Sequence, residues 1–112
     1  MSTNGVTPVI SGNKPDEGEL SRFIQLKEHA KKMFINNNFK EAEVFYSKAA
    51  KELLSYIETD TQSRQNCIDC LNNIAQCDIN LNEYSKALVY VNRVLEYDDN
   101  NFKALYRKGI SL

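Results

Sequence analysis

The chain has 112 residues, a length that supports one ordinary domain with a modest hydrophobic core. Its 14 basic and 15 acidic residues give a formal net charge of -1, which argues against a protein built chiefly to hold nucleic acid or an anionic membrane surface. Its apolar runs are only a few residues long, so no membrane-spanning segment is expected.

Residues 1–18 are predicted to form a disordered leader. Pro8, Pro15 and several Gly and Asn residues interrupt this stretch, and its few apolar residues follow no regular period. It lacks the basic region followed by an apolar stretch that is typical of a secretory signal. A cytoplasmic protein is therefore expected.

From residue 19 on, apolar residues recur at steps of three and four, which predicts helices and no strand. The predicted helices cover residues 19–36, 39–58, 62–81, 84–97 and 102–112. Asparagine-rich segments separate the first helix from the second and the third from the fourth, because asparagine competes for helix hydrogen bonds and tolerates turns. Ser63 or Thr61 is expected to cap the third helix, and the polar run 98–101 to cap the fifth. The predicted fold class is all-α.

The chain can be superposed on itself. A shift of 45 residues aligns the first two predicted helices with the next two, and a further shift of 34 residues reaches the fifth. Small residues recur in this alignment, and we expect them to let paired helices approach closely. The aligned sets are Leu26, Leu71 and Leu105; Ala30, Ala75 and Gly109; Phe39 and Tyr84; Ala42 and Ala87.

With this spacing and these small residues, the sequence resembles the tetratricopeptide repeat family, whose period is 34 residues. The resemblance implies a superhelix of antiparallel helix pairs over residues 19–112. Repeat one would cover 23–56, an extension 57–67, repeat two 68–101, and the first helix of a third repeat 102–112. In such a superhelix the first helix of each pair lines a concave groove, which suits an extended peptide better than catalysis. The chain departs from the family pattern at His29, Leu54, Asp99 and Lys108.

Five polar residues on the predicted first helices are candidates for this groove. Lys27 and Lys31 lie one turn apart, as do Lys103 and Arg107, and Asn73 lies on the helix between them. Clustered cations in a chain of balanced charge favour an anionic ligand, and a peptide that carries carboxylates fits best.

The segments LKEHAKKMF, LNNIAQC and FKALYRKG are similar to the carboxylate-clamp subclass of the family. In co-chaperones of that subclass, the clamp holds the terminal carboxylate and the Asp side chain of the Glu-Glu-Val-Asp tail of cytosolic heat-shock chaperones of the ninety- or seventy-kilodalton class. Lys27, Asn73, Lys103 and Arg107 match the clamp, whereas Lys31 stands where the family usually has Asn and some immunophilins have Thr. The resemblance thus implies a non-enzymatic adaptor that docks such a tail.

Two alternatives follow from the same resemblance. The extension is similar to the long helices of immunophilin repeat domains, so the chain is alternatively the C-terminal repeat region of an FKBP-type peptidyl-prolyl isomerase. The other alternative is a repeat scaffold that binds a different partner. The sequence predicts no particular oligomeric state.

The remaining signals for chemistry are weak. Cys67 and Cys70 have the spacing of a redox or zinc pair, but only Cys77 and the remote His29 are further ligands, so three free packing thiols are expected. No nucleophile accompanies His29, and no Gly-rich phosphate loop is present. We therefore expect no metal, no cofactor and no catalytic group.

Overall fold

A computed structural model describes residues 13–112, and most of the predicted leader lies outside this part of the chain. The described residues form helices and no strand, which confirms the all-α prediction. None of these helices combines the length and the apolar character needed to cross a membrane. The elements are α1 (Glu17–Ile35), α2 (Phe39–Leu53), the short 3-10 helix η2 (Leu54–Tyr56), α3 (Thr61–Asn80), α4 (Tyr84–Tyr97) and α5 (Phe102–Ser111).

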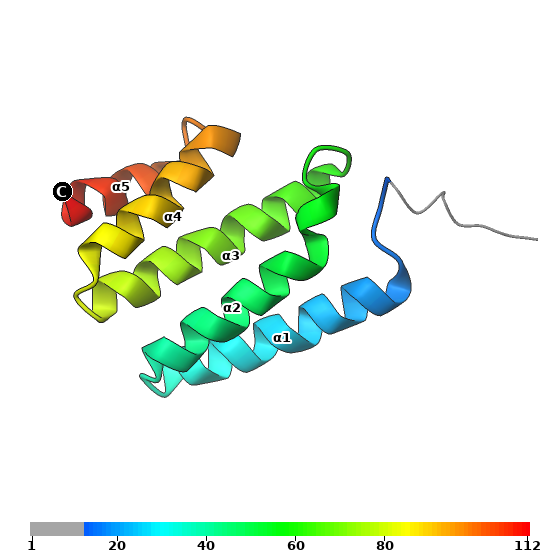
Figure 1. Ribbon diagram of the computed structural model, residues 1–112, viewed down its shortest axis with the longest axis horizontal. Coiled ribbons are helices and arrows are strands. Elements are labelled where there is room, and N and C mark those ends of the chain that lie inside the picture. The colour runs from blue at the N-terminus through cyan, green and yellow to red at the C-terminus, as the bar shows by residue number, and fades with distance from the viewer. Residues whose placement is uncertain (1–12) are drawn as a thin grey trace, which may run out of the picture.

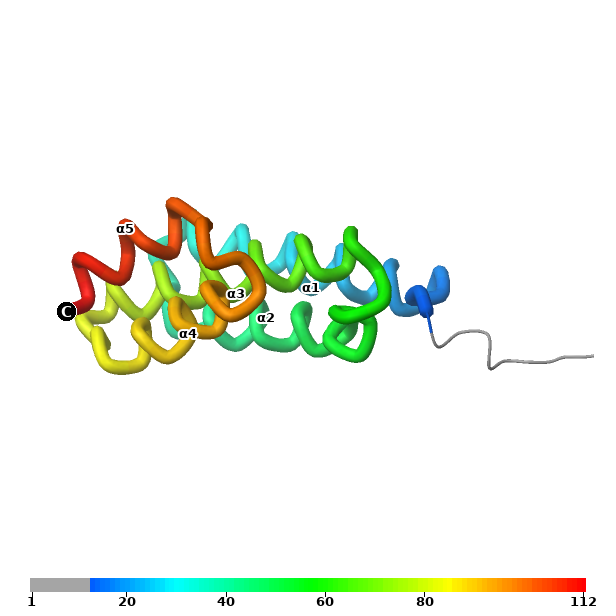
Figure 2. The backbone as a smooth tube through the Cα atoms, turned by 90° about the horizontal axis from the view of Figure 1, so that it is seen from above, coloured from blue at the N-terminus to red at the C-terminus, as the bar shows by residue number. Residues whose placement is uncertain are grey.

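The helices pack in sequence order, each against the next, as antiparallel neighbours (Figure 1). Seen from above, they form two layers, with α1, α3 and α5 in one layer and α2 and α4 in the other (Figure 2). The first helix of each predicted pair therefore lies on the same side of the molecule.

Small residues occupy the crossings between neighbouring helices, as the alignment of the sequence with itself predicts. Ala30, Ala42, Ala75 and Ala87 are all 0% exposed and belong to one continuous core. Gly109 is an exception, since a Cβ atom placed there would meet no described atom within 4 Å. The expectation that Gly109 permits close helix approach is wrong, because none of the described helices packs against that side of α5.

The two turns between paired helices have the same geometry. Asn37 and Asn82 adopt left-handed backbone conformations, with φ of 64° and 60°. In each turn, the next amide donates to a carbonyl five residues back: Asn38 to Met33 at 2.8 Å, and Glu83 to Asp78 at 2.7 Å. Asparagine favours these positions because it tolerates positive φ better than most residues. The predicted helix breaks therefore fall in the right places for the expected reason.

The first helix begins at Glu17, inside the predicted leader. Asp16 is its N-cap: the carboxylate accepts from the amide of Glu19 at 2.8 Å, and the Glu19 carboxylate accepts from the amide of Asp16 at 3.0 Å. Glu19 also accepts a 2.6 Å hydrogen bond from the hydroxyl of Tyr56, which ties the start of α1 to η2. The prediction of a leader that extends to residue 18 is thus wrong for Glu17 and Gly18, because this reciprocal cap starts the helix at Glu17.

The periodicity predicts that the second helix runs to about residue 58, but α2 ends at Leu53. The chain tightens into η2, and Tyr56 and the residue after η2, Ile57, are buried, at 7% and 6% exposure. The third helix is then capped by Asp60, and neither Thr61 nor Ser63 is the cap. Ile57 continues the apolar period past Leu53 because its side chain is buried, but its backbone lies in a turn and not in a helix.

Replacing Asp60 with alanine should lower the free energy of unfolding by about 1 to 2 kcal/mol. The Asp60 carboxylate accepts from both the amide and the hydroxyl of Ser63, at 3.1 and 2.7 Å, and Ser63 is 1% exposed. Loss of the Asp60 carboxylate would leave the buried Ser63 hydroxyl without this hydrogen-bond acceptor. Urea denaturation measures the change, and Thr61→Ala is the matched control at the neighbouring exposed position. Equal losses in the two variants would contradict the role of Asp60.

Candidate functional site

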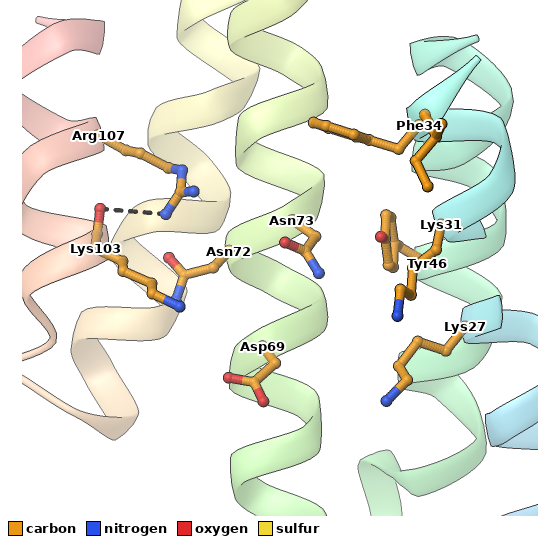
Figure 3. A pocket seen from close by; sticks show the side chains of 10 residues that line it. Lys27, Lys31, Phe34, Tyr46, Asp69, Asn72, Asn73, Lys103 and Arg107 are labelled. Carbon is orange, nitrogen blue, oxygen red and sulfur yellow. Dashed lines mark hydrogen bonds between the residues drawn. The ribbon is translucent and has the colours of Figure 1, made fainter. Parts of the chain in front are cut away.

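A groove of about 450 Å³ is lined mainly by residues of α1, α3 and α5. All five residues predicted for it line this groove: Lys27 and Lys31 from α1, Asn73 from α3, and Lys103 and Arg107 from α5. Figure 3 shows α3 in the centre, with the lysines of α1 on one side and the cations of α5 on the other. The repeat of helix pairs brings together side chains that are up to 80 positions apart in the chain.

The groove cations are largely free of acidic partners. Among residues 13–112, no carboxylate lies within ion-pair distance of Lys27, Lys103 or Arg107. Lys31 approaches Glu28 at 3.8 Å, but both side chains are 54% exposed, so this pair is weak. Lys27 lies 5.5 Å from the centre of the Phe23 ring. Four cations are therefore available to an anion in the groove.

Five further residues line the groove and were not predicted from the sequence. Asp69 brings a single carboxylate, which accepts from Gln65 at 3.0 Å and lies on α3 between Lys27 and Lys103 (Figure 3). Asp69 precedes Asn73 by one turn, so this spacing was a usable signal for it. The other four are Asn72, Phe34, Ile35 and Tyr46.

The apolar part of the groove lies near the C-terminal end of α1. Ile35 is 75% exposed there, and Tyr46 from α2 is only 3% exposed although it reaches the groove wall. Burial raises the pKa of the Tyr46 hydroxyl to about 12, so this group is a neutral hydrogen-bonding group at neutral pH. The groove thus joins a cationic centre to an apolar wall.

Arg107 is held by groups of the protein itself. Its Nε atom donates to Oε1 of Gln76 on α3 at 2.9 Å, and Nη1 donates to the backbone oxygen of Lys103 at 3.4 Å. Partial burial lowers the pKa of the guanidinium, which still remains protonated as arginine does in proteins. The side chain is thus a fixed positive charge with an ordered direction.

A cluster of carboxylates lies outside the groove, between α2, α3 and α4. Oxygen atoms of Glu43, Asp78 and Glu83 lie within 4.8 Å of one another, which is close enough to hold a metal ion. The amine of Lys86 already occupies this cluster, at 3.1 Å from Glu43, 3.6 Å from Glu83 and 3.8 Å from Asp78. Since the ammonium group supplies the positive charge, the residues fit an ion-pair cluster better than a metal site.

The three cysteines and His29 lie outside the groove. Cys67, Cys70 and Cys77 are free and buried, and burial raises the pKa values of their thiols to about 11, 12 and 12. A thiol with so high a pKa carries almost no thiolate at neutral pH, and the thiolate is the form that binds metal or attacks a disulfide. His29 is exposed and packs against the Phe45 ring, with 4.1 Å between ring centres.

Comparison with known proteins finds relatives that share most of this chain. It is 32% identical over 94 residues to FK506-binding protein 59 of Drosophila melanogaster, an alignment that covers 84% of the chain and 21% of that protein. It is 31% identical over 97 residues to the Hsp70/Hsp90 co-chaperone cns1 of Schizosaccharomyces pombe, covering 86% of the chain and 25% of that protein. The chain thus spans about a fifth to a quarter of the length of these two relatives.

A solved structure agrees with the fold over most of its length. It is the C-terminal TPR-containing domain of a Plasmodium falciparum FK506-binding protein, where TPR denotes tetratricopeptide repeat. The two share 30% sequence identity with a TM-score of 0.77, and the match covers 88% of this chain and 68% of that one. No protein-family model matches the sequence.

Proposed function

Because the chain belongs to the tetratricopeptide repeat family, we propose that it is a cytoplasmic adaptor that binds the acidic C-terminal tail of a heat-shock chaperone. The observation that carries the proposal is the meeting of Lys27, Lys103, Arg107 and Asn73 in one groove. Cations without acidic partners, gathered from three helices, favour a ligand with more than one carboxylate.

The proposed mechanism is electrostatic capture followed by orientation. Lys27 and Lys103 lie on opposite sides of α3 and would bind the terminal carboxylate and the side-chain carboxylate of the last Asp. Arg107 adds a directed guanidinium, and the Asn73 amide offers a donor and an acceptor that fix the tail's register. The chain itself acts by binding, and no catalytic step is assigned to it.

The apolar wall gives the tail a second anchor. Phe34, Ile35 and Tyr46 lie along the groove from the cationic centre, and we assign to them the Val side chain that precedes the last Asp. Lys31 lies between the two regions in Figure 3, where a longer cation replaces the amide usual in the family. It adds a fourth positive charge that would also attract the Glu residues of the tail.

A second candidate function has support of its own. Two of the three similar proteins described above are FK506-binding proteins, and one of them is specifically a C-terminal repeat domain. On this basis the chain would be the chaperone-docking region of an FKBP-type peptidyl-prolyl isomerase. An isomerase assay on the product of the longest transcript that contains this sequence tests the candidate, and it leaves the role of the groove unchanged.

Calorimetric titration with a peptide that ends in Met-Glu-Glu-Val-Asp tests the adaptor function. We expect saturable binding of the free acid and no measurable binding of the same peptide with an amidated C-terminus, because amidation removes the terminal charge. Equal binding of the two peptides would show that recognition does not depend on the terminal carboxylate of the partner. Absence of binding by either peptide would reject the proposed partner.

A further inference from the structure

α5 brings two of the groove cations but buries little of its own surface. Its buried residues are only Ala104 and Ser111. Its large apolar side chains are exposed: Phe102, Leu105, Tyr106 and Ile110. Since apolar burial supplies most of the stability of a packed helix, polar contacts with neighbouring helices take a larger share in setting the direction of α5.

An amide side chain of α3 makes the first of these contacts. Asn72 is 4% exposed, and its Nδ2 atom donates to Oδ1 of Asn101 at 3.3 Å. The same oxygen accepts from the amide of Ala104 at 3.0 Å and so caps α5. This contact ties the start of α5 to the middle of α3 and places the next turn of α5 within reach of the groove.

A second amide, one turn along α3, holds the cation itself. Oε1 of Gln76 accepts from Nε of Arg107 at 2.9 Å. The Gln76 amide is in turn oriented by Asn80, whose Oδ1 accepts from Nε2 of Gln76 at 2.9 Å. Nitrogen and oxygen of this amide therefore have separate partners, and the oxygen is left facing Arg107.

We propose that Gln76 is a positioning residue that determines how Arg107 meets an anionic ligand, an inference that rests on the proposed function. A guanidinium has five N–H groups. Gln76 takes the one on Nε, and the Lys103 carbonyl takes one on Nη1. The three that remain are on the two terminal nitrogens, so Arg107 meets a carboxylate end-on and not through the side that includes Nε.

Without Gln76, the arginine side chain would have to be ordered by the ligand. Immobilising the arginine side chain on binding has an entropic cost. Because this cost would then fall on the binding step, affinity should decrease about three- to tenfold. Gln76→Met tests this, because methionine keeps the length of the side chain and removes its hydrogen-bonding groups. Gln62→Met is the matched control, since Gln62 lies on the same helix, bonds a neighbour four residues on and does not line the groove.

Two measurements together decide the proposal. In a double-mutant cycle with the free-acid peptide, Gln76→Met should weaken binding in the wild-type background and have no effect in the Arg107→Ala background. Equal weakening in both backgrounds would overturn the proposal, because Gln76 would then act independently of Arg107.

The second measurement needs no ligand. The Arg107 Nε–H signal in the nitrogen-15 spectrum of the free protein should be resolved in the wild type and in Gln62→Met, and should merge with the signals of exposed arginines in Gln76→Met. An unchanged signal in Gln76→Met would overturn the proposal. If the wild type binds no acidic peptide, the proposed function fails, and this signal still shows separately whether Gln76 holds Arg107.

Discussion

Arg107→Ala is expected to weaken binding of the free-acid tail peptide at least tenfold. Each charge-assisted hydrogen bond to a carboxylate contributes about 1.5 to 3 kcal/mol, and about 1.4 kcal/mol corresponds to a factor of ten in affinity. Arg107 is partly buried and ordered by Gln76, so its interaction with an anion is less screened than that of an exposed lysine. Calorimetric titration of the variant measures the loss.

Two controls separate binding from folding in this experiment. Arg93→Ala removes an arginine of α4 that is exposed, lies 5.8 Å from the Tyr90 ring and does not line the groove, so its affinity should be unchanged. Circular dichroism and the thermal midpoint of Arg107→Ala should stay close to those of the wild type. Wild-type affinity in Arg107→Ala would contradict the role of this residue in the clamp.

Asp78→Asn is expected to stabilise the fold at neutral and alkaline pH, by several kcal/mol at pH 8. Asp78 is 0% exposed, and burial raises its pKa to about 8, with the neighbouring Glu43 and Glu83 adding to the effect and Lys86 opposing it. The folded state therefore binds a proton that the unfolded state has already released. Stability contributed by this proton is present below about pH 4 and is lost as the pH rises from about 4 to 8.

The variant should differ from the wild type in the slope of stability against pH. A single such group changes the free energy of unfolding by at most about 1.4 kcal/mol per pH unit. An asparagine at position 78 keeps a neutral side chain of nearly the same shape, and its amide can donate to Glu43 as a protonated carboxyl would. Urea denaturation between pH 5 and 9 should show a flatter dependence in Asp78→Asn. Parallel curves for the two proteins would contradict a buried proton on Asp78.

The candidate site was largely predictable, because its residues repeat at helical spacing. Lys27 and Lys31 share a helix face because they are four residues apart, and so do Lys103 and Arg107. The repeat then places these faces on successive helices of one layer. Tyr46 was not predicted as a groove residue, because the helical period of apolar residues assigns its ring to the core, although the side chain also lines the groove.

The acid cluster could not be predicted by the same reasoning. Asp78 is polar and lies near a predicted helix end, and residues of this type usually face water. It is buried because α2 and α4 close over it and bring Glu43 and Lys86 to its carboxylate. Its unusual pKa thus depends on groups of α2 and α4 that helix packing brings to α3.

Local patterns in this chain are sufficient for the number of α-helices, the turns at Asn37 and Asn82, the alanines at the crossings and the cationic face. Each depends on residues a few positions apart, whose relative placement follows from helical geometry and turn preferences. The end of α2, the burial of Asp78 and the contact between Gln76 and Arg107 depend on segments that meet only after the helices pack. The sequence spacing of such residues says nothing about their distance, because packing between helices brings them together.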